Sequence, residues 1–176
     1  LSRVDTVAIF EELAQGDPAI AAYISIHNMV AWMIDAYGSD AQCAEWLPRL
    51  TSMAGFGAYC LTEPGAGSDA AAIATSAIPS RDEQGGDEYV LTGVKQFISG
   101  GGEAAVYVVM ARTDPSTGSG HGGARGITAF VVPDGTPGLS FGQEEKKMGW
   151  NAQPTRQVIL DEVRVPASAV LGELGG

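Results

Sequence analysis

The residues best suited to chemistry lie in one short segment, residues 59–69, which reads YCLTEPGAGSD. An apolar run over residues 56–61 leads into this segment and predicts a buried strand. Pro64, Gly65 and Gly67 then end the strand, because proline and glycine favour turns. Glycine lacks a Cβ, so the backbone there can adopt positive φ and approach a ligand closely.

This glycine-rich turn could bind an anion. Successive exposed N–H groups form an anion-binding nest, and the hydroxyls of Thr62 and Ser68 stand at its edges. The segment matches neither common phosphate loop, since no Gly-Lys-Ser/Thr follows it and its spacing is not Gly-x-Gly-x-x-Gly. We therefore expect either a seat for a phosphorylated cofactor or an ordinary glycine-rich turn.

The remaining polar residues provide no convincing catalytic base and no metal site. His27 lies on a predicted helix face and His121 in a glycine-rich loop, and two isolated histidines indicate neither a triad nor a metal centre. Glu63 precedes a proline in the turn, so we expect a structural carboxylate there. Glu103 follows three glycines and residues 144–147 form a charge run, so we expect both to be solvated.

Composition limits the classes of partner. The chain has 176 residues, of which 45% are hydrophobic, enough for one core with a small helical cap. A formal net charge of −11 disfavours nucleic acid, because phosphate binding needs a basic surface. Cys43 and Cys60 have neither metal-site nor disulfide spacing, which favours a reducing compartment. No apolar run reaches 18 residues and no signal or transit peptide is visible, so we expect no membrane insertion.

The first 50 residues have a helical pattern. A periodic segment over residues 4–16 predicts one helix, and Asp17-Pro18 starts a second with Asp as N-cap and Pro at the first position. Gly38 is well placed to cap the end of this second helix. Residues 39–42 form a capping box for a third helix, which we expect to stop around Leu47-Pro48.

From Gly55 onward the pattern changes to short β-rich runs bounded by Gly, Pro and Asp. These runs cover residues 89–91, 106–110, 127–132, 139–141 and 158–160. Short turns favour antiparallel pairing over βαβ units, and residues 113–125 are typical of a mobile surface loop. The expected fold is α+β, with a helical segment (1–54), a small antiparallel β-barrel domain (55–166) and a connection (167–176).

Several motifs in order along the chain resemble the acyl-CoA dehydrogenase family of flavoenzymes, and they cover nearly all of it. They are residues 59–69, Gly93 to Gly102, Gly126 to Val132, Thr136 to Leu139, Lys147 to Trp150, Thr155-Arg156 and Val163 to Pro166. Phe97-Ile98-Ser99 and residues 149–156 are most similar to the isobutyryl-CoA dehydrogenase branch. Since family members extend beyond residue 176, we expect this chain to be a fragment without the C-terminal helical bundle.

The resemblance implies a site for FAD. The cofactor-binding residues would be Tyr59, Cys60, Leu61, Thr62, Glu63, Pro64, Gly65, Ala66, Gly67, Ser68, Phe97, Ile98 and Ser99. Thr62 would donate its hydroxyl to the isoalloxazine, Phe97 would pack against the ring and Ser99 would hydrogen-bond to N5. Ser68 would contact both FAD and the acyl-CoA substrate. Many members carry Trp and Thr where this chain has Phe97 and Ser99, and both departures keep the ring and the hydroxyl.

Two further residues have alternative interpretations. Trp150 could line an acyl pocket or pack against the barrel, and we favour packing. Arg156 could pair with a CoA phosphate or with a carboxylate, and the excess of acidic residues favours the carboxylate.

The resemblance also implies a reaction. It is the FAD-dependent α,β-dehydrogenation of an acyl-CoA, such as isobutyryl-CoA in valine degradation, to the 2-enoyl-CoA. The catalytic base would be a glutamate beyond residue 176, so no catalytic residue is assigned here and the isolated fragment should show little turnover. An electron-transfer flavoprotein would accept the electrons from a homotetramer, in the mitochondrial matrix of a eukaryote or the cytoplasm of a bacterium. The alternatives are an acyl-CoA oxidase, a flavin-dependent hydroxylase, or a non-catalytic β domain that binds flavin or acyl-CoA.

Overall fold

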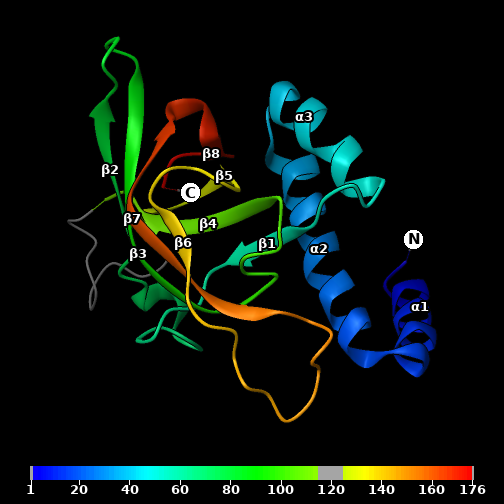
Figure 1. Ribbon diagram of the computed structural model, residues 1–176. Coiled ribbons are helices and arrows are strands. Elements are labelled where there is room, and N and C mark those ends of the chain that lie inside the picture. Colours follow the sequence, from blue (N-terminus) through cyan, green and yellow to red (C-terminus); the bar gives the residue numbers. More distant parts are fainter. Residues whose placement is uncertain (1, 115–124, 176) are drawn as a thin grey trace.

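The computed structural model describes residues 2–114 and 125–175, so His121 and most of the loop expected at 113–125 lie outside the described residues. Figure 1 shows three helices, α1 (Arg3–Gly16), α2 (Pro18–Tyr37) and α3 (Asp40–Thr51), beside a curved sheet domain. The helical first part and the β-rich second part confirm the predicted α+β fold class.

Both predicted helix starts are confirmed, because capping depends on neighbouring residues alone. The Asp17 carboxylate accepts hydrogen bonds from the N–H groups of Ala19 and Ile20 at 2.7 and 3.1 Å. Ser39 and Gln42 form the reciprocal capping box that opens α3.

The predicted cap of α2 at Gly38 is confirmed, whereas the predicted end of α3 is wrong. Helix α3 continues through Pro48 to Thr51, because one lost hydrogen bond is outweighed by burial of Trp46 and Leu50 on its packing face. Gly38 follows α2 in an extended conformation rather than a left-handed one. Glycine is needed there for close approach, since an added Cβ would lie 2.4 Å from the Ile34 carbonyl oxygen.

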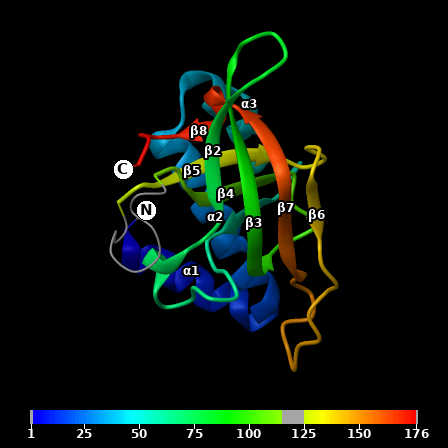
Figure 2. The same cartoon turned by 90° about the vertical axis from the view of Figure 1, so that its left-hand side faces the viewer.

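The β domain is one eight-stranded sheet with the order β6-β7-β3-β2-β4-β5-β8, and β1 pairs with β4. The strands are β1 (Gly57–Cys60), β2 (Ser76–Arg81), β3 (Asp87–Ser99), β4 (Val106–Arg112), β5 (Ile127–Pro133), β6 (Leu139–Phe141), β7 (Thr155–Pro166) and β8 (Val170–Leu171). Two short 3-10 helices lie at Ala70–Ala72 and Ala167–Ala169. Figure 2 shows the sheet curling around its interior, while the pairing of the described strands runs from β6 to β8 without a bond between those two.

Most strands pair antiparallel, as predicted, but β1 runs parallel to β4 in a register that pairs Tyr59 with Val108. A single parallel pair also joins Ser76 of β2 to Arg112 of β4. The sequence analysis missed β2 and β8, because β2 contains Pro79 and exposed Ile78, and β8 is two residues long.

Two hydrophobic clusters lie on opposite faces of the sheet. The inner one contains Cys60, Tyr107 and Phe130, and the outer one joins α2 and α3 to β4 and β5. His27 joins α2 to α3 and β1 by two hydrogen bonds. Its Nε2 donates to the Leu50 carbonyl at 3.1 Å, and its Nδ1 accepts from the Gly57 N–H at 3.2 Å. Helix α2 therefore covers the strand that leads into the glycine-rich turn.

Helix α2 is also long and apolar enough to cross a membrane by length and composition, which the sequence analysis did not anticipate. The core helix of a soluble protein can have the same length and composition. In this structure α2 buries Val30 and Ile34 against the sheet domain.

Candidate functional site

The glycine-rich turn is tighter than the sequence suggests. After β1, the backbones of Glu63 and Ala66 exchange two hydrogen bonds of 3.0 and 3.1 Å. Gly65 and Gly67 have no positive φ, so this turn does not use the left-handed conformation that glycine allows. Both glycines are nevertheless open to a ligand, because an added Cβ at either would have no neighbour within 4 Å.

The positive φ values occur instead at the second predicted segment, on β3. The pairing of β3 with β7 shifts register between Lys95 and Ile98, and within this bulge Phe97 has a φ of +58°. A bulky residue in this conformation is strained, and such strain is typical of functional sites. The bulge turns Phe97 outward, so that its side chain is 61% exposed rather than part of the core.

Hydrogen bonds hold the two predicted cofactor segments side by side. The Gln96 N–H donates to the Thr62 carbonyl at 2.7 Å, and the Lys95 ammonium donates to the Leu61 carbonyl at 3.2 Å. Residues more than 30 positions apart in sequence therefore share one edge of the fold, which positions Phe97 close to the turn.

A buried ion pair completes this link. The Lys95 Nζ lies 2.7 Å from Glu63 Oε1, and the Glu63 carboxylate also accepts from the N–H groups of Ala74 and Thr75 at 2.7 and 2.9 Å. Burial by itself would raise the pKa of Glu63, but the Lys95 ammonium and the other hydrogen bonds outweigh it and lower that pKa. The Glu63 side chain is thus structural, as expected, and does not act as a base.

The thirteen predicted cofactor residues differ in what they can offer a ligand. Buried residues are Cys60, Glu63, Ala66 and Ile98; half-buried ones are Tyr59, Leu61, Thr62 and Ser99; exposed ones are Pro64, Gly65, Gly67, Ser68 and Phe97. Cys60 and Ile98 face the inner cluster, where a cofactor outside the sheet cannot reach their side chains. Within the described residues the hydroxyls of Thr62 and Ser68 have no hydrogen-bond partner, so both are free to bind a ligand.

The loop between β6 and β7 adds residues that the sequence analysis missed. The Lys147 ammonium donates to the carbonyls of Trp150 and Gln153 and, at 3.0 Å, to the Thr155 hydroxyl. The Gln153 amide in turn donates to the Ser99 hydroxyl. The expectation of a fully solvated charge run at 144–147 is therefore wrong for Lys147, and only the tertiary contacts identify its role.

The positions of two other side chains in this region decide between the alternative interpretations that the sequence left open. Trp150 is 55% exposed with a φ of +58°, so the favoured interpretation that it packs against the barrel is wrong. Arg156 lies 3.9 Å from Glu103 and 3.8 Å from Glu144, so the prediction of carboxylate partners is confirmed. Glu103 is thus exposed but paired.

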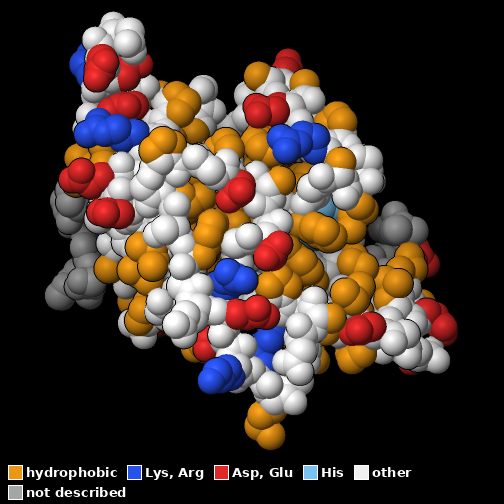
Figure 3. All heavy atoms as spheres, in the orientation of Figure 1, with side chains coloured by type: hydrophobic (Ala, Val, Ile, Leu, Met, Phe, Trp, Pro, Cys, Tyr) orange, Lys and Arg blue, Asp and Glu red, His pale blue; other side chains and the backbone are white. Residues whose placement is uncertain are grey.

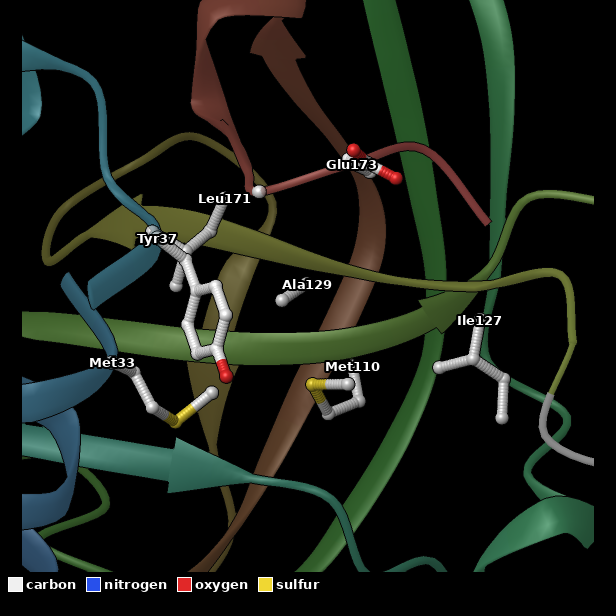
Figure 4. A pocket seen from close by; sticks show the side chains of 8 residues that line it. Met33, Tyr37, Met110, Ile127, Ala129, Leu171 and Glu173 are labelled. Carbon is white, nitrogen blue, oxygen red and sulfur yellow. The ribbon is translucent and has the colours of Figure 1, made fainter. Parts of the chain in front are cut away.

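An apolar cavity with a volume of about 540 Å³ lies elsewhere, between α2 and β4, β5 and β8. Figure 4 shows Met33, Tyr37 and Met110 around it, with Glu173 at its rim. None of the thirteen predicted cofactor residues lines this cavity. Figure 3 shows further apolar side chains gathered over α1 and α2 on the outer surface.

Comparisons with known proteins place this chain in a family. The sequence matches the acyl-CoA dehydrogenase N-terminal domain over residues 1–54 and the middle domain over residues 58–163. It is 53% identical to mitochondrial isobutyryl-CoA dehydrogenase of Bos taurus and 49% identical to that of Dictyostelium discoideum, over 99% of this chain in each case.

A solved structure supports the same assignment. Glutaryl-CoA dehydrogenase from Mycobacterium smegmatis in complex with FADH2 is 36% identical and superimposes with a TM-score of 0.81, covering 95% of this chain and 40% of that one. The chain spans only 39% and 40% of the length of the two relatives above. Agreement of sequence and fold over nearly every residue leads to one conclusion: the chain belongs to the acyl-CoA dehydrogenase family.

Proposed function

We propose that this chain forms the flavin-facing part of an FAD-dependent acyl-CoA dehydrogenase. The observation that carries the proposal is Phe97, an exposed aromatic ring held at positive φ beside a turn whose two hydroxyls have no partner in the described part of the chain. An apolar ring exposed at a strained position fits a planar aromatic cofactor, which would cover the ring and exclude water. The similarity to a structure in complex with FADH2 supports the same cofactor.

The residues of this chain would bind and orient that cofactor. Phe97 would cover one face of the isoalloxazine, and Thr62 and Ser99 would supply hydroxyls to its edge. Ser68 would contact both FAD and the acyl-CoA. Bound FAD supplies the acceptor for the hydride that leaves the substrate β-carbon. The Lys95–Glu63 pair holds both segments in register, so the site is preorganised before the cofactor arrives.

The α-proton must go to a carboxylate, and three acidic residues of this region are already paired. Glu63 is bound by Lys95 and by two N–H groups, and Glu103 and Glu144 form ion pairs with Arg156. We therefore propose that the base lies outside residues 1–176 in the complete protein. The substrate class we propose is a short branched acyl-CoA such as isobutyryl-CoA, on the strength of the 53% identity to the bovine enzyme.

We further propose an electron-transfer flavoprotein as acceptor and a homotetramer as the assembled form. The protein would lie in the mitochondrial matrix if its source is eukaryotic and in the cytoplasm if its source is bacterial. Two of the similar proteins are named as mitochondrial, and a short-chain-specific relative comes from the bacterium Megasphaera elsdenii.

The test is to express the complete reading frame that contains this chain and record its visible spectrum without oxygen. Bound flavin that bleaches with isobutyryl-CoA, and less with glutaryl-CoA or palmitoyl-CoA, would support the proposal. Flavin that bleaches only with another acyl-CoA would retain the reaction and refute the substrate. Rapid reoxidation of the reduced enzyme by oxygen would indicate an oxidase or hydroxylase, and protein purified without flavin would indicate a non-catalytic domain.

A further inference from the structure

The Gln153 side chain makes a contact that no motif predicts. It is 5% exposed, lies in the loop before β7, and its amide nitrogen donates to the hydroxyl of Ser99. Ser99 is the last residue of β3 and pairs with Thr155 of β7. The buried Gln153 amide therefore donates a hydrogen bond to the Ser99 hydroxyl, which the proposed function places at the flavin edge.

The contact decides how Ser99 can act. A serine hydroxyl has one proton to donate and two lone pairs to accept. Accepting from Gln153 occupies one lone pair and leaves the proton, which has no acceptor among the described residues. Ser99 is thus left with a free donor, and N5 and the C4 carbonyl of oxidised flavin are acceptors.

The loop backbone fixes the direction of the Gln153 amide. The Lys147 ammonium binds the main-chain carbonyl of Gln153, and the Gln153 N–H donates to the Trp150 carbonyl at 3.1 Å. The next carbonyl, that of Pro154, accepts from the Gly100 N–H at 2.9 Å, beside Ser99. Both ends of the contact are therefore anchored, so little side-chain entropy is lost when a ligand binds.

We propose that Gln153 is a positioning residue that holds the Ser99 hydroxyl as a hydrogen-bond donor toward the bound flavin. This inference rests on the proposed function, because the acceptor is the flavin. It predicts that Gln153 acts only through Ser99. A carboxylate at position 153 would instead accept the Ser99 proton and withdraw it from the flavin, which reverses the direction of the bond.

The experiment uses the complete FAD-loaded protein and measures the FAD dissociation constant and the flavin absorption band. Gln153→Leu and Ser99→Ala should each weaken FAD binding about 2- to 10-fold, the range for one hydrogen bond. The double variant should bind FAD no more weakly than the worse single variant, because both remove the same interaction. Gln153→Glu should shift the absorption band and disfavour flavin reduction about tenfold, which is about 30 mV for a two-electron couple.

Gln42→Leu is the matched control. Gln42 is also buried, and its amide donates to the carbonyls of Ser168 and Val170, away from the site. It should lower the melting temperature while leaving the FAD dissociation constant and the band unchanged, which separates a loss of folding from a loss of positioning.

Two results would overturn the inference while the proposed function stands. If the losses of Gln153→Leu and Ser99→Ala add in the double variant, Gln153 does not act through Ser99. If Gln153→Glu leaves the flavin band and potential as in the wild type, Ser99 already donates to residue 153 rather than to the flavin. Wild-type protein without bound flavin would contradict the proposed function itself.

Discussion

Replacing Lys95 by methionine should be among the most damaging single changes in this chain. The Lys95 side chain is fully buried and its ammonium donates to the Leu61 carbonyl and to Glu63. Methionine has a similar length and fills much of the same space, so the variant removes the charge and the hydrogen bonds with little change in volume.

The expected loss of stability in Lys95→Met depends on the interactions that Glu63 keeps. Removing one partner of a buried ion pair leaves the other charge uncompensated and costs about 3–5 kcal/mol. Glu63 keeps the N–H groups of Ala74 and Thr75, so we expect the lower end, about 3 kcal/mol. A domain of ordinary stability has about 5–15 kcal/mol in total, so the loss is a large fraction of it.

The assay is urea unfolding followed by the fluorescence of the tryptophans. The set is Lys95→Met, Glu63→Gln, the double variant, and the exposed Lys146→Met as control, which should stay within about 0.5 kcal/mol of the wild type. The double variant should recover at least 1 kcal/mol relative to the sum of the single losses, because neither buried charge is then left alone.

Two outcomes would refute this reasoning. A loss below about 1 kcal/mol for Lys95→Met would mean that the buried carboxylate tolerates isolation. Simple additivity in the double variant would mean that the two side chains do not interact. A pH series adds an independent check, because the pKa of Glu63 is lowered on folding. Its stabilisation should be present above pH 4.5 and lost as the pH falls through the folded-state pKa, so wild type should lose more stability there than Glu63→Gln.

Three further predictions use other buried groups. Burial lowers the pKa of His27, so below about pH 6.5 the unfolded state binds more protons than the folded state, and the free energy of unfolding should decrease as the pH is lowered. Urea unfolding at pH 7 and pH 5 should show a smaller decrease for His27→Gln than for the wild type, and equal decreases would contradict this. Tyr107→Phe should cost about 1–3 kcal/mol, because the Gly102 N–H loses its acceptor, while Tyr23→Phe should cost almost nothing, because among the described residues the Tyr23 hydroxyl has no partner; similar losses by denaturation would refute this. Burial raises the pKa of Cys60 to about 12, so mass spectrometry after thiol labelling at neutral pH should find Cys60 modified only in unfolded protein.

Local chemistry accounts for the parts of the fold that the sequence predicted well. The N-caps at Asp17 and Ser39 bond to residues two or three positions away, so no distant segment can change them. Long-range packing accounts for the parts that differed. Pro48 stays helical because Leu50 is buried against the sheet domain, and β1 runs parallel to β4 although the turns favoured antiparallel pairing.

The sequence by itself determined the family, the α+β class and the two segments that carry the candidate site, because these depend on residue types in order along the chain. It could not determine which side chains in those segments face inward. Simple alternation would place Lys95 and Phe97 on the same face of β3, whereas the structure buries Lys95 and exposes Phe97. The bulge in β3 shifts the alternation, and Glu63, brought close by the fold, compensates the buried ammonium. Only the tertiary structure therefore decided that the charge holds the site together while the aromatic ring is left exposed.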